Sequence, residues 1–343
     1  MRIGVLTAGG DAPGLNAAIR SIGHMAFRDG HELIGIENGW AGLANEFAGR
    51  ELTPSDLSGI VGQGGTLLGT IRYDLDSPAG GRLHVLKAID EHFDALVAIG
   101  GDGTQRISYW LAERGAPVVG VPKTLDNDLV GTDYCIGFDT AVSIVAESLD
   151  RLYTTAASHH RVMIVETMGR ATGWVAAMGG LAGGADLIVI PEFPMTMDEI
   201  ISHLVKRRSS SSAFSIVVVA EGIDLGTVGG VESSELSSDG IRGVRLATRG
   251  VGHFVASKID EYGGFEVRTT VLGHLQRGGS PTAYDRIWAT RVGASAYDAV
   301  VAGKFGVIPL VRGNEVTLEP LSVVATGQRH VPRELYELCA AFF

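Results

Sequence analysis

Acidic, basic and hydroxyl side chains gather in one short stretch, PKTLDND at residues 122–128, directly after an apolar run. Lys123 and Thr124 precede two carboxylates, Asp126 and Asp128, that are separated by one residue. One carboxylate can take a proton from a hydroxyl group while a second helps to hold a metal complex. The stretch therefore predicts acid–base chemistry at the end of a strand, where open α/β sheets bind their ligands. A solvated turn would use the same residue types and remains the alternative.

Two glycine-rich turns each stand between an apolar run and a helical pattern, at Ala8–Gly14 and at Gly100–Thr104. Paired glycines let the backbone approach a ligand, and the N-terminus of the following helix favours an anion. The second turn, GGDGT, also contains the carboxylate of Asp102. Mg²⁺ prefers carboxylate and phosphate oxygens, so Asp102 predicts a magnesium ligand beside a bound phosphate. Alternatively, Asp102 only caps the helix together with Thr104.

Arginines stand beside glycines in the second half of the chain, in MGR at Met168–Arg170 and in GHLQRGG at Gly273–Gly279. Guanidinium groups match the geometry of phosphate, and a carboxylate can accept hydrogen bonds from sugar hydroxyls. The side chains with this chemistry are Arg161, Arg170, Arg268, His274, Arg277 and Glu221. Together they predict a phosphorylated sugar as the ligand, although a single arginine of this kind is more often part of a surface ion pair.

Composition excludes several classes of protein. The 343 residues carry a formal net charge of −11, which argues against nucleic acid or an anionic membrane surface as the main partner. No apolar run approaches the roughly 20 residues of a membrane span. Two cysteines, Cys135 and Cys339, make no disulfide framework and no zinc site. Motifs of the types G-x-G-x-x-G and G-x-x-x-x-G-K-[ST] are absent, which removes the usual dinucleotide and P-loop sites. We expect a cytoplasmic enzyme.

Short apolar runs alternate with helical patterns along the chain, which predicts doubly wound α/β lobes with mainly parallel sheets. The expected strands are Arg2–Thr7, Ala95–Gly100, Pro117–Pro122, Arg161–Glu166, Asp186–Ile190, Phe214–Glu221 and Val267–Leu272. The expected helices are Leu15–Phe27, Thr104–Glu113, Thr140–Thr154, Met197–Lys206, Gly243–Tyr262 and Thr282–Ala302. Ser209–Ser212 and Gly226–Gly240 are polar stretches that we interpret as surface loops. The number of strands is high for one sheet, so two Rossmann-like lobes are expected.

The combination of GGDAPGLN, GGDGT, PKTLDND, MGR and GHLQRGGSP resembles the phosphofructokinase family over nearly the whole chain. The resemblance implies two interleaved lobes, with residues 1–137 plus 276–325 binding the phosphoryl donor and residues 138–275 plus 326–343 binding fructose 6-phosphate. It also implies a homotetramer with active sites shared between subunits, in which Arg161 and Arg268 reach a neighbouring subunit's sugar phosphate.

The resemblance assigns roles to individual residues. Asp126 would take the proton from the 1-hydroxyl of fructose 6-phosphate, Asp102 would bind Mg²⁺, and Asp128 would support the metal. Arg72, Arg170 and Thr124 would assist the transfer, with Arg72 stabilising the charge that develops. The residues implied to bind fructose 6-phosphate are Thr124, Asp126, Arg161, Met168, Gly169, Arg170, Glu221, Arg268, His274 and Arg277. The residues implied to hold the donor are Gly9, Arg72, Tyr73, Asp102, Gly103, Thr104 and Lys123.

Two positions, Gly103 and Lys123, bear on which phosphoryl donor the protein uses. Gly103 is typical of family members that use ATP, whereas Lys123 is typical of those that use pyrophosphate. An aspartate at position 103 would exclude the α-phosphate of ATP, while Lys123 only adds a positive charge that either donor tolerates, so ATP is favoured. The alternatives are a pyrophosphate-dependent enzyme, a kinase of another sugar phosphate such as sedoheptulose 7-phosphate, and an inactive ligand-sensing relative.

Overall fold

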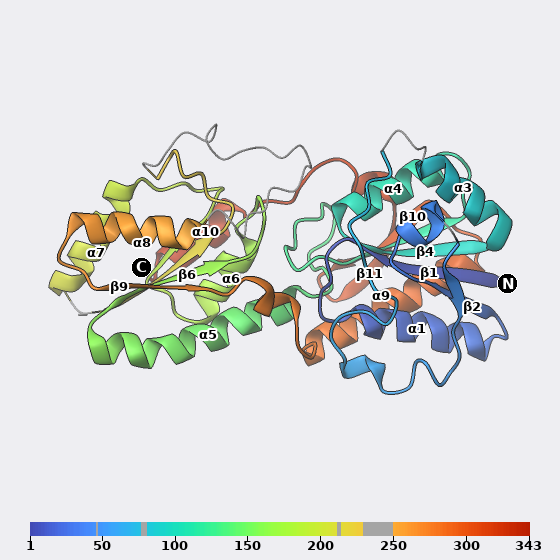
Figure 1. The fold of residues 1–343 in the computed structure, drawn as a ribbon, viewed down its shortest axis with the longest axis horizontal. Helices are drawn as coiled ribbons and strands as arrows, with labels where there is room; N and C mark the ends of the chain where they lie inside the picture. The colour runs from blue at the N-terminus through green and yellow to red at the C-terminus, as the bar shows by residue number, and fades with distance from the viewer. Residues whose placement is uncertain (46, 77–80, 211–213, 229–249) are drawn as a thin grey trace. The chain divides into compact units, whose positions relative to one another are not determined.

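The computed structural model describes all residues except 46, 77–80, 211–213 and 229–249 (Figure 1). The chain forms two compact units. Unit 1 consists of Met1–Thr140 and Arg277–Arg329, and unit 2 consists of Ala141–Gln276 and His330–Phe343. The chain therefore passes between the units three times, so that neither unit is made from one continuous segment.

Unit 1 is built on a seven-stranded sheet in the order β11-β10-β5-β4-β1-β2-β3. Its strands are β1 (Arg2–Ala8), β2 (Glu32–Ile36), β3 (Gly49–Glu51), β4 (Ala95–Gly100), β5 (Val118–Pro122), β10 (Val307–Arg312) and β11 (Glu315–Pro320). The five central strands are parallel, and the two edge strands β11 and β3 are antiparallel to their neighbours. Every residue of β4 is buried, as expected of a parallel strand that is covered on both faces.

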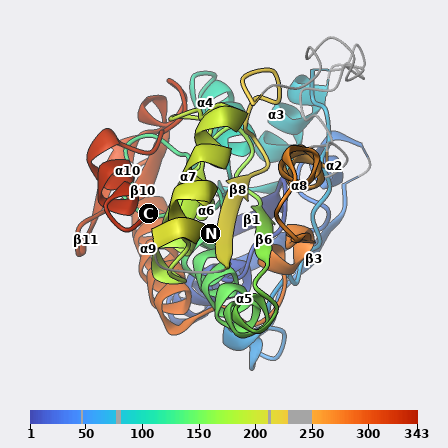
Figure 2. The same cartoon turned by 90° about the vertical axis from the view of Figure 1, so that its left-hand side faces the viewer.

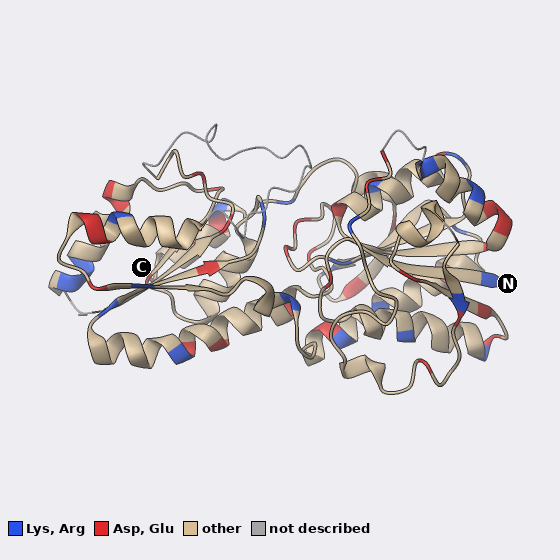
Figure 3. Ribbon diagram, viewed as in Figure 1, with Lys and Arg blue, Asp and Glu red and all other residues tan. Residues whose placement is uncertain are grey.

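Helices cover both faces of this sheet. They are α1 (Leu15–Arg28), α2 (Ala41–Ala44), α3 (Gly81–His92), α4 (Asp102–Ala112) and α9 (Ala283–Val301). The pair α1 and α9 pack against each other on one face, while α3 and α4 lie on the other (Figure 1). The strands between these layers carry few charged residues, and most of the charged residues of this unit lie on the helices and loops around them (Figure 3).

Unit 2 has a four-stranded parallel sheet in the order β7-β8-β6-β9. The strands are β6 (Val162–Thr167), β7 (Leu187–Val189), β8 (Ser215–Ala220) and β9 (Val267–Val271). The helices are α5 (Phe138–His159), which begins at the end of unit 1, α6 (Trp174–Ala182), α7 (Met197–Ser210), α8 (Val251–Tyr262) and α10 (Arg333–Ala340). Helix α8 packs on β6 and β9, and α5 lies on the other side of that sheet (Figures 1 and 2).

The predicted fold class, two interleaved doubly wound lobes with mainly parallel sheets, is confirmed. The expected strands and helices are all present, with ends that differ by a few residues. One loop assignment is wrong, because α7 continues through Ser210. The rest of that stretch, most of Gly226–Gly240 and the start of the helix expected from Gly243 lie outside the described residues. No helix within the described part of the chain is long and apolar enough to cross a membrane.

Candidate functional site

The PKTLDND segment begins where β5 ends and is almost fully buried. Lys123, Asp126 and Asp128 are each 3% exposed. The ammonium group of Lys123 donates hydrogen bonds to the backbone carbonyls of Ala8, at 3.3 Å, and of Gly10. This lysine therefore joins the end of β5 to the glycine turn that follows β1.

Thr124 and the two aspartates form one buried polar group. The backbone N–H of Asp126 donates to Thr124 Oγ1 at 3.1 Å, and Gln328 Nε2 donates to Asp128 Oδ2 at 3.2 Å. The structure does not show the alternative, a solvated turn, because a solvated turn would expose these side chains. Gln328 belongs to none of the sequence motifs. It lies about 200 residues from Asp128 along the chain, so only the fold reveals this contact.

The GGDGT turn lies against the PKTLDND segment. A Cβ atom placed on Gly101 would stand 3.3 Å from the carbonyl oxygen of Lys123 and 3.5 Å from Cβ of Thr124. In contrast, a Cβ atom on Gly103 would meet nothing within 4 Å, so space is open beside this residue. The turn thus brings an open stretch of backbone next to buried carboxylates.

Asp102 is the first residue of α4 and does not cap the helix, whose N-cap residue is Gly101 and has no capping side chain. Its carboxylate accepts a hydrogen bond at 2.8 Å from Nε of Arg106, one helical turn further on. The side chain of Asp102 is 23% exposed, so it is partly accessible in the turn. A partly exposed carboxylate at a helix N-terminus fits the oxygen donor that a divalent cation takes together with phosphate. The alternative role, helix capping alone, is not what this geometry provides.

The first glycine turn receives residues from two other segments of unit 1. Gly9 has φ 84°, a left-handed conformation suited to glycine, and its carbonyl accepts from Thr70 Oγ1 at 2.7 Å. This bond places the loop that carries Arg72 and Tyr73 beside the turn. Nη1 of Arg277, which is 8% exposed, donates to the backbone carbonyl of Asp11 at 2.9 Å. The 3₁₀ helix Gly273–Arg277 that ends in this arginine holds His274 as an exposed side chain.

In unit 2, the MGR segment follows β6 and is held by a carboxylate from the end of β8. Arg170 has φ 52°, which is uncommon outside glycine, and Gly169 has φ 145°. Glu221 Oε1 accepts from the backbone N–H groups of both, at 3.0 Å from Arg170 and 3.3 Å from Gly169. Met168 N donates to Oε1 of buried Gln276 at 3.3 Å. Glu221 was predicted to contact sugar hydroxyls, and the structure adds a role that the sequence did not reveal, that of orienting this backbone.

Arg161 and Arg268 lie at the other end of the same sheet. Arg161 directly precedes β6, and Arg268 is the second residue of β9. Both contact Oε1 of Glu266, at 2.6 Å from Arg161 Nη2 and 2.8 Å from Arg268 Nη2. The hydrogen bond from Arg161 is the main reason that the pKa of Glu266 lies below its usual value. Glu266 was not singled out in the sequence, where an acidic residue beside an arginine has no special pattern.

The structure therefore divides the predicted sugar-binding residues of unit 2 into two groups. Met168, Gly169, Arg170 and Glu221 lie at the carboxyl ends of β6 and β8, and His274 follows the carboxyl end of β9, whereas Arg161 and Arg268 lie at the amino ends of their strands. Strand β6, of six residues, separates the two groups by roughly 20 Å. One small ligand cannot touch both groups within a single subunit.

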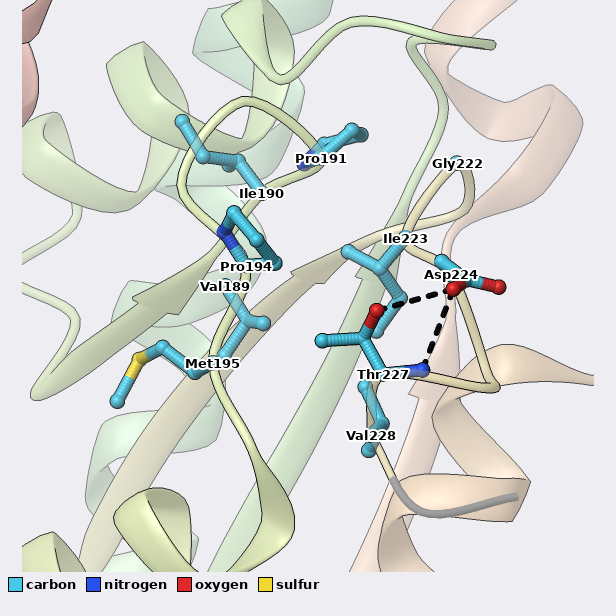
Figure 4. A pocket seen from close by; sticks show the side chains of 10 residues that line it. All are labelled: Val189, Ile190, Pro191, Pro194, Met195, Gly222, Ile223, Asp224, Thr227 and Val228. Atoms are coloured by element: carbon cyan, nitrogen blue, oxygen red, sulfur yellow. Dashed lines mark hydrogen bonds between the residues drawn. The ribbon is translucent and has the colours of Figure 1, made fainter.

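A separate cavity of about 180 Å³ lies between the ends of β7 and β8 (Figure 4). Its walls are mostly apolar and include Ile190, Pro194 and Ile223. Asp224 is the one acidic residue among the described residues that line it, and its carboxylate accepts from the backbone N–H and the hydroxyl group of Thr227 at 3.2 and 2.9 Å. Of the described lining residues, none was predicted as a site residue.

Glycine turns at parallel strand ends, buried carboxylates beside them and an accessible carboxylate at a helix N-terminus define an α/β enzyme that transfers phosphoryl groups. Comparison with known proteins agrees. The sequence model described as "Phosphofructokinase" matches residues 2–300. The chain belongs to the phosphofructokinase family.

Its relatives include proteins with two different donors in their names. The chain is 48% identical to an "ATP-dependent 6-phosphofructokinase" of Chloroflexus aggregans, over 99% of this chain and 95% of the relative. It is 45% identical to a "Pyrophosphate--fructose 6-phosphate 1-phosphotransferase" of Amycolatopsis methanolica, over the full length of both. Phosphofructokinase from Pichia pastoris, solved in the T-state, is similar in structure, with a TM-score of 0.83 and 29% identity. That similarity covers 99% of this chain but 36% of the Pichia chain, so this chain spans about a third of its length.

Proposed function

We propose that the protein is an ATP-dependent 6-phosphofructokinase, which transfers a phosphoryl group from ATP to the 1-hydroxyl group of fructose 6-phosphate. The observation that carries the proposal is the packing of the GGDGT turn against the buried Thr124–Asp126 group. This packing brings a site for phosphate next to a carboxylate that can accept a proton. The names of the relatives at 43–48% identity support the same activity.

The choice of ATP rests on Gly103 and Lys123. The open space beside Gly103 leaves room for the α-phosphate of ATP, which an aspartate side chain would fill with negative charge. The ammonium group of Lys123 is bonded to two backbone carbonyls, so its charge does not by itself require pyrophosphate. Pyrophosphate remains the second candidate donor, because a relative of 45% identity carries that name.

In the proposed mechanism, Asp126 takes the proton of the 1-hydroxyl group. Thr124 Oγ1 accepts a hydrogen bond from the backbone N–H of Asp126 and so helps to orient this residue. Arg72 and Arg170 neutralise charge on the transferred group, which is the main requirement of phosphoryl transfer. Asp102 would hold Mg²⁺, which supplies charge neutralisation on the phosphate oxygens when it is bound. His274 and Arg277 would bind the 6-phosphate, while Gly9, Tyr73, Gly103 and Thr104 would line the donor site.

The separation of the two sugar-binding groups in unit 2 supports a shared active site. Arg161 and Arg268 lie roughly 20 Å from the MGR segment, at the opposite end of the sheet. We therefore propose that these two arginines bind the sugar phosphate of a neighbouring subunit, within a homotetramer. The proposed enzyme then lacks a complete sugar site as a monomer.

The test is an initial-rate assay with fructose 6-phosphate and Mg²⁺, supplied with ATP in one series and pyrophosphate in the other. Turnover with ATP alone is expected. Asp126→Asn should lower kcat by about 10³-fold or more, because it removes the base. Asp198→Asn, at an exposed position of helix α7, is the matched control and should leave kcat unchanged. Turnover with pyrophosphate alone would overturn the choice of donor, and turnover with neither would overturn the proposed function.

A further inference from the structure

Asn127 separates the two buried aspartates and has an unusual backbone. Its φ is 52°, in the left-handed region that costs most L-residues roughly 1–2 kcal/mol but that asparagine adopts more readily. The residue is 1% exposed, so its polar groups have almost no access to water and rely on hydrogen bonds within the protein. Such a conformation persists only where the surrounding structure fixes it.

The side chain of Asn127 is tied to a later segment of the chain. Oδ1 accepts a hydrogen bond from the backbone N–H of Cys135 at 2.9 Å, and Nδ2 donates to the carbonyl of Asp133 at 3.3 Å. The amide group supplies the acceptor oxygen and the donor nitrogen from one planar side chain. Both polar atoms of the Asn127 side chain therefore have a backbone partner.

The segment that holds Asn127 is itself fixed within unit 1. Asp133 N donates to the carbonyl of Val311 in β10 at 2.8 Å, and the hydroxyl of Tyr134 donates to Asp285 in α9. Asp285 is fully buried and also accepts from Thr140 N at 2.8 Å. The tether of Asn127 therefore ends on a strand and a helix, rather than on a loop.

Backbone contacts hold the same peptide from the other side. Arg329 N donates to the carbonyl of Asp128 at 2.8 Å, and Arg329 Nη1 donates to the carbonyl of Asn127 at 3.4 Å. The peptide between the two aspartates is thus held by two separate segments of unit 1, one that contains Asp133 and Cys135 and one that contains Arg329. Since residues on either side of a left-handed residue point in directions that an extended chain would not give, the conformation of Asn127 sets where Asp126 and Asp128 face.

We propose that Asn127 is a positioning residue for phosphoryl transfer, which aims the carboxylate of Asp126 by holding a left-handed turn between the two aspartates. This inference rests on the proposed function. The same segment would fold with other residues at this position, but the carboxylate of Asp126 would then be displaced. A displacement of about 1 Å from the reacting atom costs about 10²-fold in rate.

Two substitutions remove the side-chain tether, one without added backbone strain and one with it. Asn127→Gly keeps access to positive φ but removes both side-chain hydrogen bonds, whereas Asn127→Ala removes the bonds and adds strain. We expect both variants to lose about 10²-fold in kcat, while KM for fructose 6-phosphate changes by less than about threefold. We expect Asn127→Gly to unfold at a higher temperature than Asn127→Ala. The kcat of Asn127→Gly is measured on the folded protein, so a failure of the alanine variant to fold does not decide the test.

The control is Thr132→Val, which loosens the same segment without touching Asn127. Thr132 Oγ1 donates to the carbonyl of Tyr134 at 2.9 Å and accepts from Val311 N at 3.0 Å. This variant should unfold at a lower temperature and keep its kcat within about twofold, because the tether of Asn127 is retained. An equal loss of kcat in this control would overturn the proposal, as would a glycine variant with the wild-type kcat.

Failure of the inference and failure of the proposed function give different results. An active wild-type enzyme with a fully active Asn127→Gly variant would overturn the positioning role alone. A wild-type enzyme that transfers no phosphoryl group from ATP or pyrophosphate to fructose 6-phosphate would overturn both. The dissociation constant of fructose 6-phosphate, measured by titration calorimetry without a donor, should differ by less than about threefold between wild type and Asn127→Gly, since the substitution affects transfer far more than binding.

Discussion

Glu221 holds the backbone of Arg170 in a left-handed conformation, with Oε1 3.0 Å from the amide nitrogen of Arg170. The carboxylate comes from the end of β8 and the arginine follows β6, so the contact joins two neighbouring strands. A charged acceptor makes hydrogen bonds of about 1.5–3 kcal/mol, enough to offset the cost of this backbone conformation. The direction of the Arg170 guanidinium therefore depends on Glu221 even before a substrate binds.

Glu221→Ala should weaken the binding of fructose 6-phosphate, because Arg170 is then free to relax. We expect KM for this substrate to rise by about tenfold or more, which corresponds to the loss of one charged hydrogen bond. Glu221→Gln keeps an acceptor oxygen for the two N–H groups and should recover part of the loss. Steady-state kinetics at saturating ATP measures both variants. Equal KM values for wild type and Glu221→Ala would show that Glu221 does not orient this segment.

Gly222→Ala should damage the same segment through steric overlap. A Cβ atom on Gly222 would lie 1.8 Å from the carbonyl oxygen of Arg170, and that oxygen belongs to a main chain already fixed by Glu221. We expect a loss of stability of about 1–3 kcal/mol together with a loss of activity. Gly327→Ala is the control, since its Cβ atom would meet nothing within 4 Å. Urea unfolding of both variants makes the comparison, and equal stabilities would contradict the prediction.

Much of this arrangement could be predicted from the sequence, because the motifs are local. Continuous apolar runs identified β4 and β6, and the glycine turns after them identified the ends at which ligands bind. The contacts of Glu266, Gln276 and Gln328 could not be predicted. Each of these side chains meets partners that are distant in sequence or lie on another strand, and ordinary polar residues carry no pattern that marks such a contact.

Some elements escaped prediction for local reasons. Strand β10 contains Pro309, which removes a backbone donor, and α6 contains Gly179 and Gly180, which lower helix propensity. In α6 the glycines permit close packing, because a Cβ atom on Gly179 would overlap Val145 of α5. Tertiary packing thus outweighs the local preference at these positions.

Glu266→Gln should change the pH dependence of stability. The two arginines hold the pKa of Glu266 below its usual value of 4.5, so the ion pairs stabilise the fold above that pH and are lost as the pH falls through the lowered value. Above pH 5 the variant should therefore melt at a lower temperature than wild type, although only slightly, because all three side chains are partly exposed. As the pH falls below the lowered pKa of Glu266, the two melting curves should converge. A difference that stays constant with pH would rule out this ionisation as its cause.

Asp285→Ala should destabilise unit 1 strongly. This fully buried carboxylate accepts hydrogen bonds from Tyr134, Gly137 and Thr140, and its removal leaves these donors without a partner in the protein interior. Each unsatisfied buried group costs about 1–3 kcal/mol, so a total above about 3 kcal/mol is expected. Asp285→Asn keeps one acceptor oxygen and should cost less. Chemical denaturation measures the free energy of unfolding of both variants. A loss below about 1 kcal/mol in Asp285→Ala would contradict the prediction that these hydrogen bonds stabilise unit 1.

Lys123→Met tests whether this lysine selects the donor. Its ammonium group is bonded to the carbonyls of Ala8 and Gly10, so we assign it the role of joining the β5 end to the first glycine turn. Loss of this link should raise KM for ATP, because the turn that we propose to line the donor site loses its support. The ratio of kcat/KM values for ATP and pyrophosphate should change by less than about threefold, since the open space beside Gly103 is untouched. A large shift of that ratio towards ATP would mean that the charge of Lys123 acts on the donor itself.

Gly103→Asp is the complementary variant, and it should lower kcat/KM for ATP more than for pyrophosphate because the added carboxylate occupies the space that the α-phosphate needs.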